Sequence, residues 1–334
     1  MSASTFQVER AVADDGPPWQ GAAHYLKAPH GHRYPSLTAT VPKELVHRAS
    51  VAEVLLTDWN RIDETHFTVT AQWPRSHSFY TPIAGGYHDP LICGETVRQI
   101  GSLLAHAEYG VPFGHAFLWW DMSLTVDPEH LQVRPTPAAL DIDVHCTDVR
   151  RRGRSLAALT YETVVRREGH VVARGRLSYT CASPAVYRRL RPEHTLEADH
   201  RPLPLTAPVA PQSVGRLSPT DVVLSPLGEP NRWQLRVDTL HPVLFDHPVD
   251  HVPGMTLLEA ARQAAAAALG RSSLLPIGID SDFKRYAELD VPCVIEARVL
   301  SRAESGTYDT VYVTGRQDGE FVFGSTVTAA PQGV

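Results

Sequence analysis

The sequence predicts an α+β chain built from two tandem copies of one unit, each a long buried helix wrapped by a curved antiparallel sheet. A Glu-x-x-Arg-Gln motif occurs twice on an apolar helical pattern, at residues 95–99 and 259–263, about half the chain apart. The segments around the two motifs also match in order, and several alternate apolar and polar residues as strands do. A Pro-rich connector at 184–211 separates the copies, because proline disfavours both helices and central strands.

The matching segments define the order of the elements in each copy. A strand pattern precedes the motif helix, and further strand patterns follow it. The last two strands of each copy are expected to join at a tight hairpin turn that contains glycine. In chain order the matched pairs are 46–56 with 214–224, 66–70 with 232–236, the motif helices, 117–126 with 277–286, 137–144 with 292–299, and the turns Glu168-Gly169 with Asp318-Gly319.

One long helix wrapped by a curved antiparallel sheet is the hot-dog arrangement. Such units pair edge to edge, so two copies in one chain predict a tandem (double) hot-dog, a pseudo-dimer that could pair further as a homodimer. Other α+β folds with one helix and several strands fit the same pattern, since periodicity alone does not separate them. The expected boundaries are an N-terminal extension at 1–40, a first domain at 41–183, a linker at 184–213 and a second domain at 214–334.

Composition and charge exclude several classes of protein. The chain has 334 residues, of which 43% are hydrophobic and 20% charged, and its net charge is −6. These values are typical of a globular protein and disfavour binding to nucleic acid or to an anionic membrane surface. The four cysteines lack Cys-x-x-Cys spacing, so neither a zinc site nor another metal or cofactor is predicted. With no apolar run long enough to cross a membrane and no signal peptide, the expected location is the cytoplasm.

The approach to the second motif carries residue types suited to thioester chemistry. His247 and His251 precede Gly254 and Met255, where the helix is expected to begin. Free backbone N–H groups and the helix dipole at such an end polarise a thioester carbonyl and stabilise the oxyanion that forms. A partly desolvated Glu259 should have a raised pKa and accept a proton.

The motif arginines are candidates for binding an anionic substrate group. Arg262 lies one turn after Glu259, and Arg98 lies one turn after Glu95. A guanidinium fork binds phosphate or carboxylate in a bidentate manner. Two other interpretations stay open: a purely structural Glu–Arg pair, and an altered or inactive site in the first copy, which has no Pro-Gly-Met segment before its helix.

The two motifs together resemble those of the A-factor biosynthesis hot-dog (AfsA) family. The resemblance lies in residues 246–263 and 89–112 and extends over 46–328. It implies an acyltransferase that moves a β-ketoacyl group from acyl carrier protein, or from CoA, to the hydroxyl of dihydroxyacetone phosphate. The product would serve the biosynthesis of a γ-butyrolactone, butenolide or furan signalling molecule. The family's helix glutamates and arginine carry over to Glu95, Glu259 and Arg262.

The resemblance and the residue chemistry together assign an expected role to each candidate. Glu259 deprotonates the acceptor hydroxyl, and the N–H groups of Gly254 and Met255 hold the thioester oxygen. Arg262, together with Arg98, is expected to bind the phosphate. His247 or His251 orients the acyl group or transfers a proton. Glu95 shares in the second proton transfer or positions the arginine.

Two other functions compete with this prediction. A hot-dog acyl-ACP dehydratase or thioesterase would use the same thioester site but needs no phosphate site, so the motif arginines argue against it. A non-catalytic ligand-binding regulator or structural partner would need neither proton transfer nor a reactive helix end.

Overall fold

Each half of the chain contributes a long helix and a run of strands to one antiparallel sheet. The computed structural model describes residues 38–153, 155–192, 201–302 and 308–331, so most of the expected extension at 1–40 lies outside the described residues. The first half contains β1 (Leu56–Arg61), β2 (His66–Trp73), α1 (Pro90–Ala107), β3 (Ala116–Val126), β4 (Ala138–Arg152), β5 (Ser155–Arg167) and β6 (His170–Ala182). The second half contains β7 (Leu224–Pro226), β8 (Arg232–Leu235), α3 (Gly254–Leu269), β9 (Pro276–Phe283), β10 (Cys293–Ser301), β11 (Asp309–Gln317) and β12 (Glu320–Ala329).

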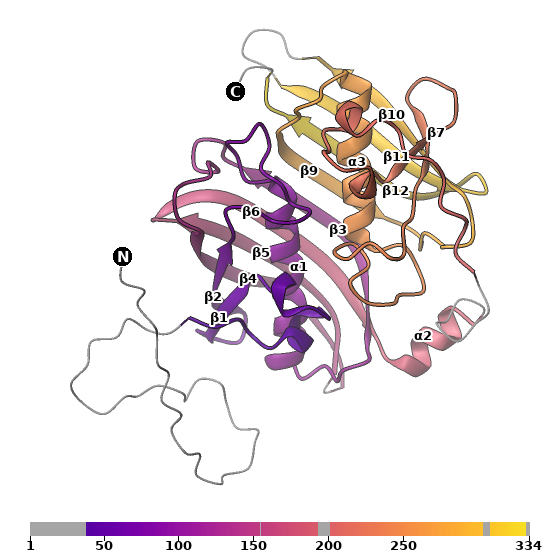
Figure 1. The fold of residues 1–334 in the computed structure, drawn as a ribbon. Helices are drawn as coiled ribbons and strands as arrows, with labels where there is room; N and C mark the ends of the chain where they lie inside the picture. Colours follow the sequence, from indigo (N-terminus) through magenta and orange to yellow (C-terminus); the bar gives the residue numbers. More distant parts are fainter. Residues whose placement is uncertain (1–37, 154, 193–200, 303–307, 332–334) are drawn as a thin grey trace, which may run out of the picture. The chain divides into compact units, whose positions relative to one another are not determined.

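The strand order confirms the predicted duplication and the tandem hot-dog. Within the described ranges the sheet has 12 strands in the order β1-β2-β4-β5-β6-β3-β9-β12-β11-β10-β8-β7, which reads the same from both ends when matched strands are exchanged. The halves join where β3 pairs antiparallel with β9, with Ser123 opposite Asp280. Figure 1 shows both helices lying against the sheet formed by the two halves. The pseudo-dimer is therefore one continuous sheet, while further pairing into a homodimer stays a prediction.

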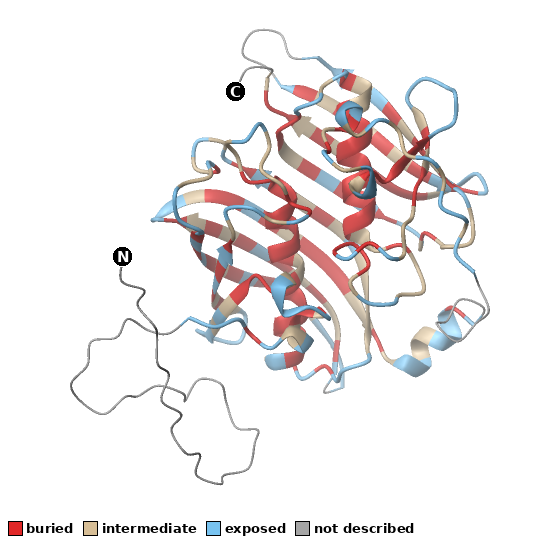
Figure 2. Cartoon of the chain, viewed as in Figure 1, coloured by how far each residue is buried: buried red, intermediate tan, exposed pale blue. Residues whose placement is uncertain are grey.

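Both helices are buried on nearly all sides, as their apolar and small residues predict (Figure 2). In α3 the alanines Ala264, Ala265 and Ala266 are fully buried, which allows the helix to lie close to the strands. In α1, Gly101 allows the same close approach to the sheet, because a Cβ at this position would lie 2.6 Å from the hydroxyl of Tyr161 in β5.

The two hairpin turns form as predicted. Glu168 and Gly169 between β5 and β6 have φ angles of 53° and 83°, and Asp318 and Gly319 between β11 and β12 have 49° and 79°. Positive φ at both central residues is the type I′ geometry, whose twist matches that of the flanking strands.

The connector between the halves differs from its prediction at one end. A short helix, α2 (Pro184–Leu190), occupies the start of the expected linker at 184–213. Proline is tolerated at the first position of a helix because its missing N–H would be unpaired there, and the Ser183 hydroxyl accepts from Val186 N–H. The domain boundaries at 41–183 and 214–334 remain our proposal.

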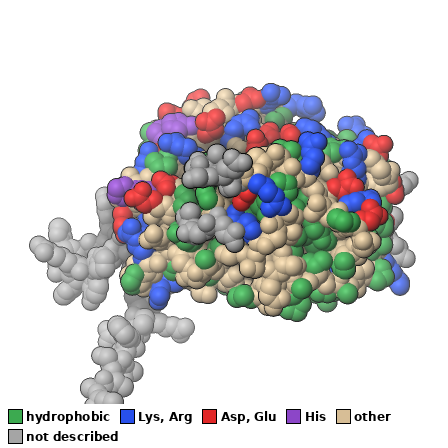
Figure 3. Space-filling model, turned by 90° about the horizontal axis from the view of Figure 1, so that it is seen from above, with side chains coloured by type: hydrophobic (Ala, Val, Ile, Leu, Met, Phe, Trp, Pro, Cys, Tyr) green, Lys and Arg blue, Asp and Glu red, His purple; other side chains and the backbone are tan. Residues whose placement is uncertain are grey.

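The surface adds two observations. No helix in the described parts of the chain is long and apolar enough to cross a membrane. On the face seen from above, basic and acidic side chains are interspersed and do not separate into patches of one sign (Figure 3).

Candidate active site

Each motif glutamate lies in a buried cluster of two arginines and a glutamine. In the first half, Glu95 accepts hydrogen bonds from Arg48 Nε at 3.0 Å, Arg98 Nε at 2.8 Å and Gln99 Nε2 at 2.7 Å. The motif alone brings Arg98 and Gln99 to the carboxylate, because residues three and four positions on share its helix face. Arg48 arrives from the segment after η2 (Lys43–Val46). We call this set the first cluster.

The second half repeats the arrangement, and we call it the second cluster. Glu259 accepts from Arg216 Nε at 2.8 Å, from Arg262 Nε at 2.9 Å and from Gln263 Nε2. Arg216 follows η4 (Pro211–Val214) as Arg48 follows η2. Sequence analysis matched these two segments but assigned no role to their arginines. The available signal was the same charged residue at a matched position of both copies.

The arginines control the charge state of both carboxylates. Burial alone would raise the pKa of Glu259, but Arg216 and Arg262 outweigh it and lower the pKa from 4.5 to about 2. Arg48 and Arg98 likewise lower the pKa of Glu95 to about 2 against the effect of burial. The expectation of a raised pKa at Glu259 is therefore wrong, because that carboxylate is buried together with two guanidinium groups.

The arginines of the first cluster line a large cavity of the described chain, and those of the second cluster do not. A cavity of about 660 Å³ is lined by Arg48 and Arg98 from the first half and by residues 243–255 of the second. The Arg98 side chain is 15% exposed, whereas that of Arg262 is 2% exposed and does not line this cavity. Glu259, at 0%, is likewise enclosed. The structure thus brings Arg98 to the cavity together with His247, His251, Gly254 and Met255, whereas the predicted site residues Glu95, Glu259 and Arg262 do not line it.

One aromatic side chain explains why the second cluster is closed. Arg216 Nη1 donates to the Phe79 carbonyl at 2.5 Å, and its guanidinium carbon lies 4.1 Å from the centre of the Phe79 ring. At the matched place in the first cluster, Arg48 Nη1 donates to the Val243 carbonyl at 2.9 Å. The smaller valine does not cover its arginine, and Val243 lines the cavity.

The start of α3 lies on the same cavity, and the helix begins at Gly254 as expected. Its N-cap residue, Pro253, supplies no side-chain hydrogen bond, and no partner occurs among the described residues for the backbone N–H of Gly254 or Met255. The start of α1 differs, because the Asp89 side chain accepts from Leu91 N–H at 3.0 Å. Two free donors at the positive end of a helix dipole therefore face the cavity from α3 alone.

Two Asp–His pairs complete the cavity wall. His251 Nδ1 lies 2.7 Å from Asp250 Oδ1, and the Tyr187 hydroxyl donates to the same carboxylate. Burial alone would raise the pKa of Asp250, but its hydrogen bond with His251 helps to lower it. His247 forms a similar pair with Asp246 at 2.5 Å. His251 also lines an adjoining cavity of about 180 Å³ with Gly254, so it stands closer to the start of α3 than its counterpart.

His47, which sequence analysis did not select, faces the cavity beside the first cluster. His106 Nδ1 lies 2.6 Å from the Val111 carbonyl and must donate to it, so His106 Nε2 accepts from His47 Nε2 at 2.7 Å. Burial and the nearby Arg98 lower the pKa of His47 to about 3. His47 is therefore a neutral imidazole whose remaining nitrogen, Nδ1, carries a lone pair.

The fold and this site define a tandem hot-dog protein with a large cavity lined by residues of both halves. Among solved structures, the chain resembles a putative oleoyl thioesterase from Lactobacillus plantarum, with a TM-score of 0.51 and 11% identity over 81% of this chain and 98% of that one. A likeness at this identity shows the shared fold alone.

The particular family follows from sequence comparison. The model of the A-factor biosynthesis hotdog domain (AfsA) matches residues 31–183 and 198–331, and the chain belongs to this family. A relative from Streptomyces virginiae named 2-oxo-3-(phosphooxy)propyl 3-oxoalkanoate synthase is 55% identical, over 86% of this chain and 96% of its own length. A relative of the same name from Streptomyces coelicolor is 42% identical, over 86% of this chain and 91% of its own length.

Proposed function

We propose that the chain transfers a 3-oxoacyl group from a thioester to the hydroxyl of dihydroxyacetone phosphate. The product is the ester after which the relatives are named, a precursor of a γ-butyrolactone, butenolide or furan signal. The observation that carries the proposal is that one cavity holds both an uncapped helix start and a partly exposed arginine. A thioesterase or dehydratase needs the first feature, whereas transfer to a phosphate-bearing alcohol needs both.

The thioester binds with its carbonyl oxygen at the start of α3. The N–H groups of Gly254 and Met255 are free to donate to that oxygen and to the oxyanion that replaces it during attack. Donors fixed by the helix backbone need no rearrangement as the charge develops. Trp119 covers the adjacent surface, because a Cβ on Gly254 would lie 2.6 Å from its ring.

His251 is the base in this mechanism. Asp250 holds Nδ1, which leaves Nε2 to take the proton of the acceptor hydroxyl while the hydroxyl oxygen attacks the thioester carbon. The tetrahedral intermediate then expels the thiolate, which recovers the proton from His251. This role replaces the one expected for Glu259, whose low pKa and enclosed position disfavour proton transfer.

Arg98 binds the phosphate of the acceptor. Its Nε and Nη2 atoms are held by Glu95 and by the Val46 carbonyl, and its Nη1 atom has no hydrogen-bond partner among the described residues. A guanidinium fixed on one edge by a carboxylate presents its other donors in a defined direction. Glu95 therefore positions the arginine, and the second cluster with Arg262 and Glu259 braces α3.

Product analysis tests the function. The enzyme is incubated with a 3-oxoacyl thioester, on acyl carrier protein or on CoA, with and without dihydroxyacetone phosphate, and the products are identified by mass spectrometry. We expect the phosphorylated ester only when the acceptor is present, and faster turnover with the carrier-bound donor if acyl carrier protein is the partner. Free acid in both mixtures would identify a thioesterase instead, and a 3-hydroxyacyl donor converted to its 2-enoyl product would identify a dehydratase.

A further inference from the structure

One residue that lines the cavity carries a buried hydroxyl with no role in the mechanism above. Tyr80 lines the cavity, its side chain is 3% exposed as part of the core, and its hydroxyl has no hydrogen-bond partner among the described residues. Burying an unpaired hydroxyl costs about 1–3 kcal/mol, so most native hydroxyls in such positions are paired. A donor left in this state on a cavity wall indicates that its acceptor is part of the ligand.

The matched residue in the second half shows that packing does not require this hydroxyl. His77 Nδ1 accepts from the backbone N–H of Tyr80, and His241 Nδ1 accepts in the same way from that of Leu244. Leu244 is also buried and also lines the cavity. An apolar side chain thus fills the equivalent place, and the first half alone adds a hydroxyl there.

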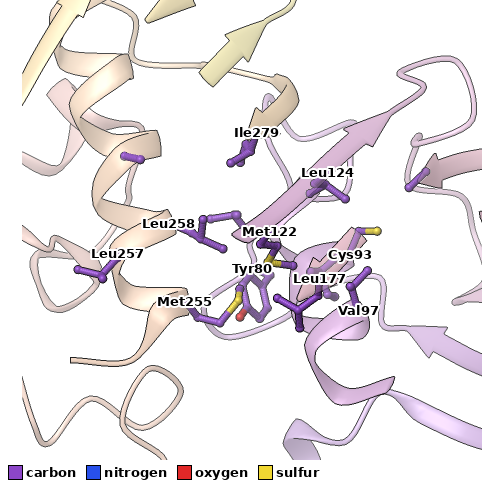
Figure 4. Close-up of a cluster of buried hydrophobic side chains, with 14 of the residues drawn as sticks. Tyr80, Cys93, Val97, Met122, Leu124, Leu177, Met255, Leu257, Leu258 and Ile279 are labelled. Carbon is purple, nitrogen blue, oxygen red and sulfur yellow. The ribbon is translucent and has the colours of Figure 1, made fainter. Parts of the chain in front are cut away.

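The surroundings of Tyr80 place this hydroxyl near the thioester site. Figure 4 shows Tyr80 in one cluster with Met255 and Leu258 of α3 and Met122 of β3. The Met255 N–H is one of the two donors assigned to the thioester oxygen. Burial, with a contribution from Glu95, raises the pKa of Tyr80 well above 10, so its O–H stays protonated and acts as a donor.

We propose that the Tyr80 hydroxyl donates a hydrogen bond to the 3-oxo oxygen of the acyl group and so selects 3-oxoacyl over saturated acyl donors. This inference rests on the proposed function. The 3-oxo carbon is separated from the thioester carbonyl by a single methylene, so both oxygens can be bound at once by donors in the same part of the cavity. A saturated acyl group would leave the hydroxyl unpaired, which is how a polar pocket rejects an analogue that lacks the matching group.

The test compares Tyr80→Phe with the wild type, using 3-oxoacyl and saturated acyl thioesters of equal chain length and dihydroxyacetone phosphate as the acceptor. The readout is the ratio of the two kcat/KM values. We expect this ratio to fall about 10- to 100-fold in the variant, through a lower value for the 3-oxoacyl donor and an unchanged or higher value for the saturated donor. The melting temperature should not fall, because the hydroxyl lost has no partner within the protein.

Tyr161→Phe is the matched control. The Tyr161 hydroxyl donates to the Val97 carbonyl at 2.6 Å within the core and lies off the cavity, so its loss should lower the melting temperature and leave the ratio unchanged. An unchanged ratio in Tyr80→Phe, or a rise in KM for dihydroxyacetone phosphate that is equal for both donors, would overturn the inference alone. A wild-type enzyme that forms ester from neither donor would overturn the proposed function and the inference with it.

Discussion

The two glutamate–arginine clusters have the same residue types and matching hydrogen bonds to their glutamates but different access to the cavity. The first cluster presents Arg98 to a cavity of about 660 Å³, whereas Phe79 covers Arg216 of the second cluster, in which Arg262 is 2% exposed. Both glutamates are fully buried, with pKa values near 2. The comparison teaches that the motif specifies a stable buried ion cluster, and that the residue lying over it determines whether the cluster can bind a ligand.

The helix starts differ in the same asymmetric way. Asp89 caps α1 and lies 3.8 Å from Arg216, so the second cluster has a protein carboxylate close to it. At the corresponding start of α3, Pro253 provides no such group; the carboxylate near the first cluster is that of Asp246, 3.3 Å from Arg48, and Arg98 still lines the cavity. A duplicated chain with two potential sites has therefore kept one of them accessible.

The largest expected effect is on stability, in Glu259→Gln. Removing this carboxylate leaves Arg216 and Arg262 buried with only Asp89, 3.8 Å from Arg216, as a nearby counter-charge, which should lower the free energy of unfolding by about 3–5 kcal/mol. Glu95→Gln should cost less, because Arg98 reaches the cavity and can be solvated. Urea unfolding of both variants measures the difference. A Glu259→Gln protein as stable as wild type but inactive would instead support the role of Glu259 as the base.

Pro253→Asp transfers the cap of α1 to α3. An aspartate here should accept from the N–H of Met255, as Asp89 does from that of Leu91, and the loss of one such donor to the oxyanion lowers kcat by about 10²–10³-fold. Helix stability should rise by about 0.5–2 kcal/mol, because the N-terminus gains a side-chain cap. Steady-state kinetics with thermal unfolding separates these effects. Full activity in a stabilised variant would contradict the assignment of the oxyanion site.

The fold could be predicted closely because its signals are local and repeated. Strand alternation, the type I′ turns at Glu168-Gly169 and Asp318-Gly319, and the helix start at Gly254 each depend on a few adjacent residues. The edge-to-edge pairing of β3 with β9 followed from the duplication itself.

The site could be predicted only in part. Helical spacing correctly brought Arg98 to Glu95 and Arg262 to Glu259. Access to the clusters involves Phe79 and Val243, whose carbonyls each accept from the arginine of the opposite half, although only the Phe79 ring covers its arginine. Contacts between residues more than 100 positions apart leave no periodic signal in one sequence. The prediction of a raised pKa for Glu259 was wrong because the second arginine, Arg216, comes from outside the motif and 43 positions away.

Arg98→Met and Arg262→Met separate the two clusters by function. Arg98→Met should lower kcat/KM for dihydroxyacetone phosphate by about 10- to 100-fold, because one charged hydrogen bond contributes about 1.5–3 kcal/mol. Its KM for the thioester should hardly change. Arg262→Met, buried and away from the cavity, should instead lower the melting temperature and keep the wild-type KM for both substrates in the folded fraction. The opposite pattern would place the phosphate at the second cluster.

The smallest effect concerns the pH dependence of stability. Because the pKa of Glu95 and of Glu259 is lowered from 4.5 to about 2 in the folded protein, each contributes stability that is complete above pH 4.5 and is lost as the pH falls toward 2. Each carboxylate should add a slope of about 1.4 kcal/mol per pH unit within this window. Glu259→Gln should remove the contribution of one carboxylate to the slope of the unfolding free energy against pH, measured by urea unfolding between pH 2.5 and 4.5 (a range of about two units). In the control Tyr161→Phe, the unfolding free energy should change with pH as it does in the wild type. An unchanged slope in Glu259→Gln would mean that the second cluster does not hold its glutamate ionised. The two clusters would then share their geometry but not the charge state of their glutamates.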